Sequence, residues 1–209
     1  IHVLADGPRF DAATSKFQTI AVEITGTAPY VQHRFSAKAS GKILAKHLDP
    51  TLRKTNTREA KVPADLYEAA THRDEQGVFG IPATSFRNAM IDACRLAGFK
   101  MTFAKMSVFV LADGLDAEEG SPLVHIKGKR EMHQATTRND TGVPDIRFRP
   151  MWRKWSAVVR IRFDADQFTE RDVINLLMRA GEQVGVGEGR PFSKDSNGCG
   201  WGTFTVGSA

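Results

Sequence analysis

Basic side chains in two stretches of the sequence are the residues best suited to chemistry, and that chemistry would be ion pairing with phosphate. Residues 34–61 carry eight lysines and arginines against two acidic residues, and residues 127–162 carry ten against three. The whole chain has a formal net charge of +5 and a sequence pI near 9.4. Because lysine and arginine contacts dominate binding to a phosphate backbone, this distribution favours a polyanionic partner.

A glycine-rich loop at residues 185–202 could complement these charges through its backbone. It holds six glycines around Arg190 and Lys194. Glycine permits positive φ, so its amide groups can come close to a phosphate or to a neighbouring main chain. The loop follows an expected helix and enters an expected strand, the reverse of a dinucleotide-binding fingerprint. A plain flexible connection is the alternative.

Histidines and acidic residues offer weaker signals of catalysis. His33 or His47 would serve as general base or acid in a metal-independent endoribonuclease, although no pairing singles one out. An acidic cluster could hold a divalent metal, but it follows a turn signal and is typical of a solvated loop. This cluster consists of Asp113, Asp116, Glu118 and Glu119. We therefore expect a binding protein, with no catalytic site, metal or cofactor.

The elements that must position these residues alternate between strands and helices. Alternating apolar residues predict strands at 17–26 and 155–163. Apolar residues at helical spacing, with start and stop signals, predict helices at 82–98 and 169–181. Shorter strands are expected at 106–111, 123–126 and 201–206, and the first two of these could pair as a hairpin.

This order of strand, helix, strand, strand, helix and strand is the split βαβ arrangement of a ferredoxin-like, or RRM-like, α+β domain. We expect one domain over residues 1–209, with long, irregular, basic insertions at residues 30–80 and 127–154. The open face of the predicted sheet lacks the two aromatic signatures of an RNA recognition motif, so we do not expect bases to stack there.

Composition points to a folded protein of a reducing compartment. Apolar residues make up 41% of the chain and charged residues 25%, close to globular averages. Neither a long apolar stretch nor a secretory signal is present, so we expect neither membrane insertion nor secretion. The two cysteines, Cys94 and Cys199, match no zinc or redox spacing. We therefore expect a cytoplasmic protein.

Three segments carry a family resemblance. Residues 80–89 read GIPATSFRNA, residues 24–29 read ITGTAP, and the glycine-rich loop lies between the second helix and the last strand. They resemble a helix start, the first strand and the hallmark loop of the RAMP superfamily of CRISPR-associated proteins, in particular the repeated backbone subunit of multi-protein effector complexes. Ala83 and Asn88 stand where the family tends to have glycine. Residues 138–206 are also similar to uncharacterised proteins of phages and prophages.

The resemblance implies a ferredoxin-like palm that polymerises as a homo-oligomer along RNA. Each subunit would grip the phosphates of a crRNA-like strand, and other CRISPR effector subunits could be partners in antiviral defence. Single-stranded DNA remains an alternative ligand, because phosphate contacts do not distinguish the two polymers. Two alternative functions are a metal-independent endoribonuclease of the same superfamily and a phage protein that mimics or blocks a CRISPR backbone subunit.

The residues expected to bind nucleic acid on this interpretation are of two kinds. The basic ones, which would contact phosphates, are Arg34, Lys38, Lys42, Lys46, Arg87, Arg138, Arg147, Arg149, Arg190 and Lys194. The apolar ones are Trp152 and Phe192, which could stack on bases or wedge between them. Packing within an insertion is the alternative role for these two aromatic residues.

Overall fold

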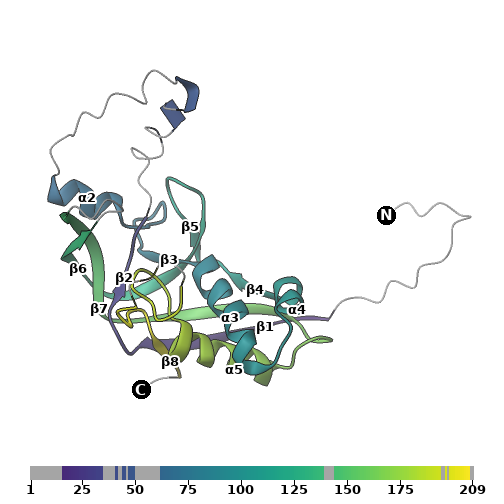
Figure 1. Cartoon of the computed structure of the whole chain (residues 1–209). Helices are drawn as coiled ribbons and strands as arrows, with labels where there is room; N and C mark the ends of the chain where they lie inside the picture. The colour runs from purple at the N-terminus through teal and green to yellow at the C-terminus, as the bar shows by residue number, and fades with distance from the viewer. Residues whose placement is uncertain are drawn as a thin grey trace, which may run out of the picture.

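An antiparallel sheet with helices on one face forms the framework of this chain (Figure 1). A computed structural model describes residues 16–34, 41, 44–45, 47–49, 62–138, 144–193, 196 and 198–207. The strands are β1 (Phe17–Gly26), β2 (Tyr30–Val31), β3 (Gly80–Pro82), β4 (Val108–Leu111), β5 (Gly114–Leu115), β6 (Pro122–Arg138), β7 (Pro144–Asp164) and β8 (Phe204–Val206). The helices are α2 (Pro63–Ala69), α3 (Ala83–Ala97), α4 (Met101–Ser107) and α5 (Glu170–Arg179), and α5 continues into the π-helical turn η2 (Ala180–Val184).

Four strands form the ferredoxin-like part of the sheet. β7 pairs with β1 and β4, and β1 pairs with β8, all antiparallel, which gives the spatial order β4, β7, β1, β8. β7 therefore separates the two strands of the unit β1–α3–β4, and β1 separates the two strands of the unit β7–α5–β8. This is the split βαβ topology, so the predicted ferredoxin-like α+β fold is confirmed.

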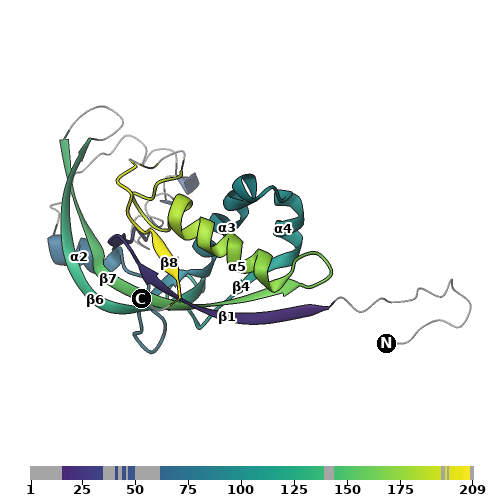
Figure 2. The same ribbon diagram turned by 90° about the horizontal axis from the view of Figure 1, so that it is seen from below.

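Helices α3 and α5 cover one face of this sheet (Figure 2). The inward residues of the two long central strands are buried, as their alternation predicts; examples are Ile24, Val159 and Ile161. Thr169 and Asp172 form the capping box that starts α5, because each side chain accepts the other's backbone N–H. These local signals explain why the sequence predicts both long helices correctly.

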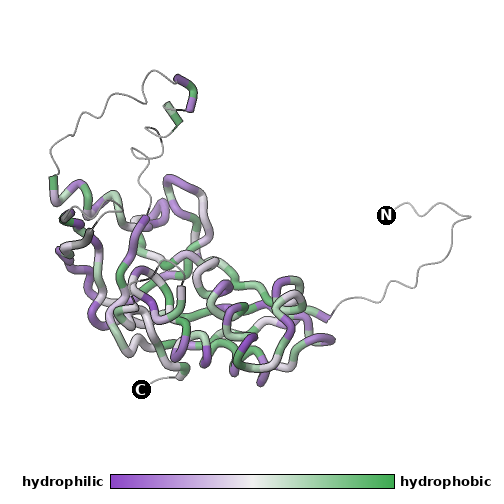
Figure 3. The backbone as a smooth tube through the Cα atoms, in the orientation of Figure 1, coloured by the Kyte–Doolittle hydropathy of each residue, from purple (hydrophilic) through white to green (hydrophobic). Residues whose placement is uncertain are grey.

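Residues 127–138 and 144–154 form a β-ribbon, which corrects the prediction of an irregular insertion. β6 and β7 pair from Ile126 and Ala157 outward to Arg138 and Pro144, with one irregularity between Gly128 and Arg130. Hydrophilic residues are frequent in the distal ribbon (Figure 3), and residues 133–138 of β6 carry no apolar alternation that would reveal a half-buried strand. Cross-strand hydrogen bonds, invisible in the sequence, fix this structure.

One predicted strand pairing and two predicted strand boundaries are also wrong. Met106 belongs to α4, and the following strand pairs with β7 instead of forming a hairpin with residues 123–126. Those residues begin β6, which pairs with β3 and β5 as well as with β7. The last strand is also shorter than expected, starting at Phe204. Short apolar segments reveal a strand but not its partner.

The first insertion is described mainly at its two ends. β2 opens it, and α2 and β3 close it. Lys38, Lys42 and Lys46, predicted to bind phosphate, lie outside the described residues, as does Lys194 of the glycine-rich loop. Within the described part of the chain, no helix is both long enough and apolar enough to cross a lipid bilayer.

Candidate nucleic-acid interface

The glycine-rich loop packs tightly against β2. Gly187 has a φ of +81°, and a Cβ atom built there would lie 2.5 Å from the Tyr30 ring and 2.5 Å from the Val31 carbonyl oxygen. The amide of Glu188 donates a hydrogen bond of 2.9 Å to that same carbonyl. Only glycine combines this backbone conformation with such a close approach. The first half of the loop is therefore a shaped wall and not a free connection.

The β6–β7 ribbon reaches the same place from the other side. Its concave side faces the loop, which lies between the ribbon and the helices in Figure 2. Arg149 on the ribbon donates from Nε to Glu188 Oε2 at 3.0 Å. β2 pairs with the ribbon through Tyr30 and Trp152, and Tyr30 also lies against Gly187 of the loop. This arrangement joins three segments that are far apart along the chain.

A cavity of about 810 Å³ opens where these segments meet. Residues from all the predicted phosphate-binding segments line it: the first insertion, the start of α3, the ribbon and the glycine-rich loop. Among them are His33, His72, Ser85, Arg147, Gly187 and Arg190. The ribbon and the glycine-rich loop thus bring Arg147 and Arg190 to one hollow, whereas the described part of the first insertion contributes no lysine or arginine to it.

Two arginines and two backbone amides of the loop are the features of the cavity wall that could hold an anion. Arg147 is about one-third exposed, and Arg190 is held in place by donating from Nη1 to the Gly187 carbonyl at 3.0 Å. The amides of Gly187 and Gly189 have no hydrogen-bond partner within the described part of the chain. Glu188 is the single acidic residue among the described wall residues, and Arg149 neutralises it. Such a wall is suited to an anion.

Of the two histidines predicted as candidate bases, His33 shares this wall, whereas His47 is exposed and does not line the cavity. The pKa of His33 is lowered, first by desolvation of its ring and then by the positive charges of Arg149 and Arg147, against the opposing effect of Glu188. His33 is therefore neutral at pH 7 and can accept a proton or a hydrogen bond.

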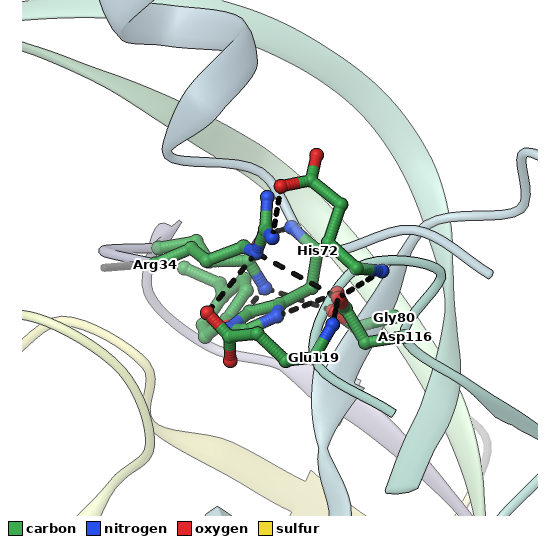
Figure 4. A network of polar contacts seen from close by, with 8 residues as sticks. Arg34, His72, Gly80, Asp116 and Glu119 are labelled. Atoms are coloured by element: carbon green, nitrogen blue, oxygen red, sulfur yellow. Dashed lines mark hydrogen bonds and ion pairs between the residues drawn. The ribbon is translucent and has the colours of Figure 1, made fainter. Parts of the chain in front are cut away.

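A buried polar network lies behind the cavity (Figure 4). His72 Nδ1 is 2.9 Å from Asp116 Oδ2, while Asp116 Oδ1 accepts hydrogen bonds from the amides of Glu118 and Glu119. Burial alone would raise the pKa of Asp116, but these hydrogen bonds and the charge of Arg34 lower it below the ordinary value. Asp116 is therefore ionised at neutral pH.

Arg34 belongs to this network and not to the cavity surface, which corrects its predicted role in binding phosphate. Its side chain is 3% exposed and is surrounded by Asp116, Glu118 and Glu119. Its charge is therefore neutralised within the protein. Glu118 and Glu119 of the acidic cluster are exposed, as expected of a solvated loop, whereas Asp116 is buried. The described residues contain no group of acidic, histidine or cysteine side chains arranged to hold a metal.

Other predicted contacts also have structural roles. Arg87 donates to the backbone carbonyls of Lys105 and Val108 and so caps the end of α4. Trp152 is fully buried in the core against Tyr30 and Phe79, so it cannot stack on bases. Packing within the protein, the alternative role considered for this residue, is the one observed.

The remaining predicted residues lie near the cavity or on the surface. Arg149 is mostly buried in its ion pair with Glu188, so it supports the wall instead of facing a ligand freely. Phe192 is 46% exposed and lies beside the Arg95 guanidinium, outside the cavity wall. Arg138 is at the distal end of β6.

Sequence reasoning missed three polar residues of the cavity. Tyr30, Gln32 and His72 form part of its wall, and Gln32 links the other two through hydrogen bonds to the Tyr30 hydroxyl and from the His72 amide. All three belong to the first insertion, where periodicity is weak. Their types are ordinary for a surface segment, so no local signal marks them.

By its topology the chain is a ferredoxin-like α+β protein with a basic cavity on the helix-bearing side of its sheet. No protein-family model matches it, and no curated protein matches its sequence significantly. A solved structure described as Cmr6 from Pyrococcus furiosus aligns with 91% of this chain and 98% of its own, at 10% sequence identity and a TM-score of 0.42. Similarity at this level establishes neither a family nor a function.

Proposed function

We propose that this protein binds RNA or single-stranded DNA through phosphate contacts that are independent of sequence. The observation that carries this proposal is the meeting of Arg147 and Arg190 with the free amides of Gly187 and Gly189 on one cavity. Cations together with convergent backbone N–H groups are the usual means of holding phosphate oxygens. The described wall offers no set of aromatic faces on which to read bases.

The size of the cavity favours a single strand. Pockets of roughly 300 to 1,000 Å³ accept molecules of nucleotide size, and this cavity has about 810 Å³. A flexible strand can place a sugar and its phosphates into such a hollow, whereas a duplex keeps its backbone on the outside of a stiff rod.

The proposal extends to a repeated backbone subunit of a CRISPR effector-like ribonucleoprotein. Support for this part comes from the resemblance of residues 24–29, 80–89 and 185–202 to the RAMP superfamily. If the subunit repeats along the strand, the number of protein copies per RNA molecule should rise in proportion to the length of the RNA. Mass photometry on oligouridines of increasing length tests this, because one copy per RNA at every length would contradict a filament.

Salt dependence tests the binding itself. Fluorescence anisotropy with labelled oligouridine between about 50 and 200 mM salt should show a steep loss of affinity. Arg147→Ala and Arg190→Ala should each lower the slope by about one. Arg153→Ala is the matched control, because Arg153 lies on the same ribbon but pairs with Glu131 outside the cavity. Binding that ignores salt, or equal effects of all three variants, would contradict the proposal.

A second candidate function is metal-independent RNA cleavage by His33. The observation in its favour is that a neutral histidine lines the cavity beside Arg147, where it could accept the proton of an attacking hydroxyl. Incubation of a structured RNA with excess protein in EDTA tests this. Products that disappear with His33→Ala would support cleavage, and intact RNA would exclude it.

A further inference from the structure

His72 is a buried histidine in which one polar atom, Nε2, has no hydrogen-bond partner among the described residues. Its side chain is 9% exposed and contributes to the cavity wall. Its amide donates to Gln32 Oε1, its carbonyl accepts from the Gly80 amide, and its Nδ1 is paired with Asp116. Nε2 has no partner within the described part of the chain and is the polar atom that remains for a ligand.

The hydrogen bond between His72 Nδ1 and Asp116 determines whether His72 Nε2 acts as a donor or an acceptor. Asp116 is ionised and already accepts two backbone hydrogen bonds, so it requires a donor from His72. In the neutral imidazole ring, a proton on Nδ1 makes Nε2 an acceptor. In its neutral form, His72 therefore presents a hydrogen-bond acceptor to a cavity that is also lined by Arg147 and Arg190.

This combination of acceptor and anion site restricts the ligand. A phosphate diester has oxygen acceptors only and cannot satisfy Nε2. The ribose 2′-hydroxyl can donate a hydrogen bond, and deoxyribose has no group at that position. A base N–H could also donate, but its position changes with the base, whereas a ribose hydroxyl recurs at every nucleotide.

From this geometry we propose that His72, positioned by Asp116, accepts a hydrogen bond from a ribose 2′-hydroxyl, so that the protein selects RNA over single-stranded DNA. This inference rests on the proposed function and makes it more specific. His72 acts here as a specificity residue and has no role in bond cleavage.

Oligonucleotides of one sequence and three sugars test the proposal on the unmodified protein. RNA should bind roughly three- to tenfold more tightly than DNA, as expected for one net hydrogen bond. RNA with 2′-fluoro sugars should bind like DNA, because fluorine keeps an RNA-like sugar conformation but donates nothing. Equal affinity for all three would overturn the inference while leaving the proposed function intact; no binding to any would overturn both.

Variants separate recognition from stability. His72→Ala should bring the RNA-to-DNA affinity ratio close to one, and His72→Gln, which retains an acceptor oxygen, should restore part of it. The matched control is His125→Gln, which removes the comparable pair of His125 Nε2 with Asp74 Oδ2 at 2.8 Å, outside the cavity wall. A ratio that survives in folded His72→Ala, or that is lost equally in His125→Gln, would overturn the inference.

The Asp116→Asn variant tests independently whether Asp116 determines which ring nitrogen of His72 carries the proton. The asparagine amide can donate to Nδ1, which would move the ring proton to Nε2 and turn that atom into a donor. The affinity ratio between RNA and 2′-fluoro RNA should then fall to about one, while salt-dependent binding persists. An unchanged ratio would show that Asp116 does not position His72.

Discussion

Arg34 donates a hydrogen bond of 2.6 Å to Glu118 although 84 positions separate the two residues in sequence. Asp116 and Glu119 lie within 3.7 Å and 3.4 Å of the same guanidinium. The pairing fastens the start of the first insertion to the turn between β5 and β6, which carries the acidic residues. Asp116 also pairs with His72 Nδ1 at 2.9 Å, so these ion pairs also support a residue of the cavity wall.

Removal of Arg34 should therefore destabilise the fold. Arg34→Ala leaves the carboxylate of Asp116, 2% exposed, without its cation, and loss of one partner of a buried pair costs roughly 3–5 kcal/mol. Urea unfolding followed by circular dichroism measures this change. The exposed pair of Arg153 with Glu131 supplies the control, and Arg153→Ala should cost less than about 1 kcal/mol. Similar losses for both variants would show that Arg34 has no special structural role.

The low pKa of Asp116 predicts acid sensitivity. A carboxylate whose pKa is lower in the folded state stabilises the protein above its unfolded pKa of about 3.9, and that stability is lost as the pH falls through the folded value. The free energy of unfolding should thus decline below about pH 4. Asp116→Asn should be less stable at pH 7 but should show a shallower decline in acid. Parallel pH curves for the two proteins would contradict this assignment.

The sequence contains the fold in its local signals but not the contacts of the site. Thr169 and the alternation of residues 155–163 mark a helix start and a strand correctly. Arg34 and Trp152 stand in a basic setting, and nothing near them in sequence reveals that distant carboxylates and aromatic rings enclose them. Arg147 keeps some exposure because its strand lies in a solvated ribbon. Contacts with residues distant in sequence decide whether a side chain in these basic segments is buried or exposed.

Glycine at position 187 should be required for the shape of the cavity. Gly187→Ala combines a strained left-handed φ with a collision against Tyr30 and Val31. Gly198→Ala is the matched control, since its φ of +66° is similar but nothing lies within 4 Å of an added Cβ. Gly198→Ala should lower the free energy of unfolding by about 1–2 kcal/mol through backbone strain alone. Gly187→Ala should lower it by clearly more and should also weaken the binding of RNA. Thermal unfolding and anisotropy measure the two effects, and equal behaviour of both variants would argue against a shaped wall.

Protonation of His33 should strengthen binding of nucleic acid in mild acid. Desolvation and the charges of Arg149 and Arg147 keep this histidine neutral in the free protein, whereas a phosphate beside it would favour the charged form. The pKa of His33 is then higher in the complex than in the free protein, so binding takes up a proton between those two values. Within that window, affinity should rise by up to about tenfold for each pH unit lowered.

Anisotropy titrations from about pH 8 to about pH 5.5, at constant ionic strength, follow this proton uptake. His33→Gln keeps a polar side chain of similar size but cannot gain a charge, so its affinity should depend much less on pH. His47→Gln should retain the full dependence, because His47 is exposed and does not line the cavity. If His33→Gln and the unmodified protein respond to pH alike, the phosphate does not approach His33 and the strand must cross the cavity nearer to Arg190.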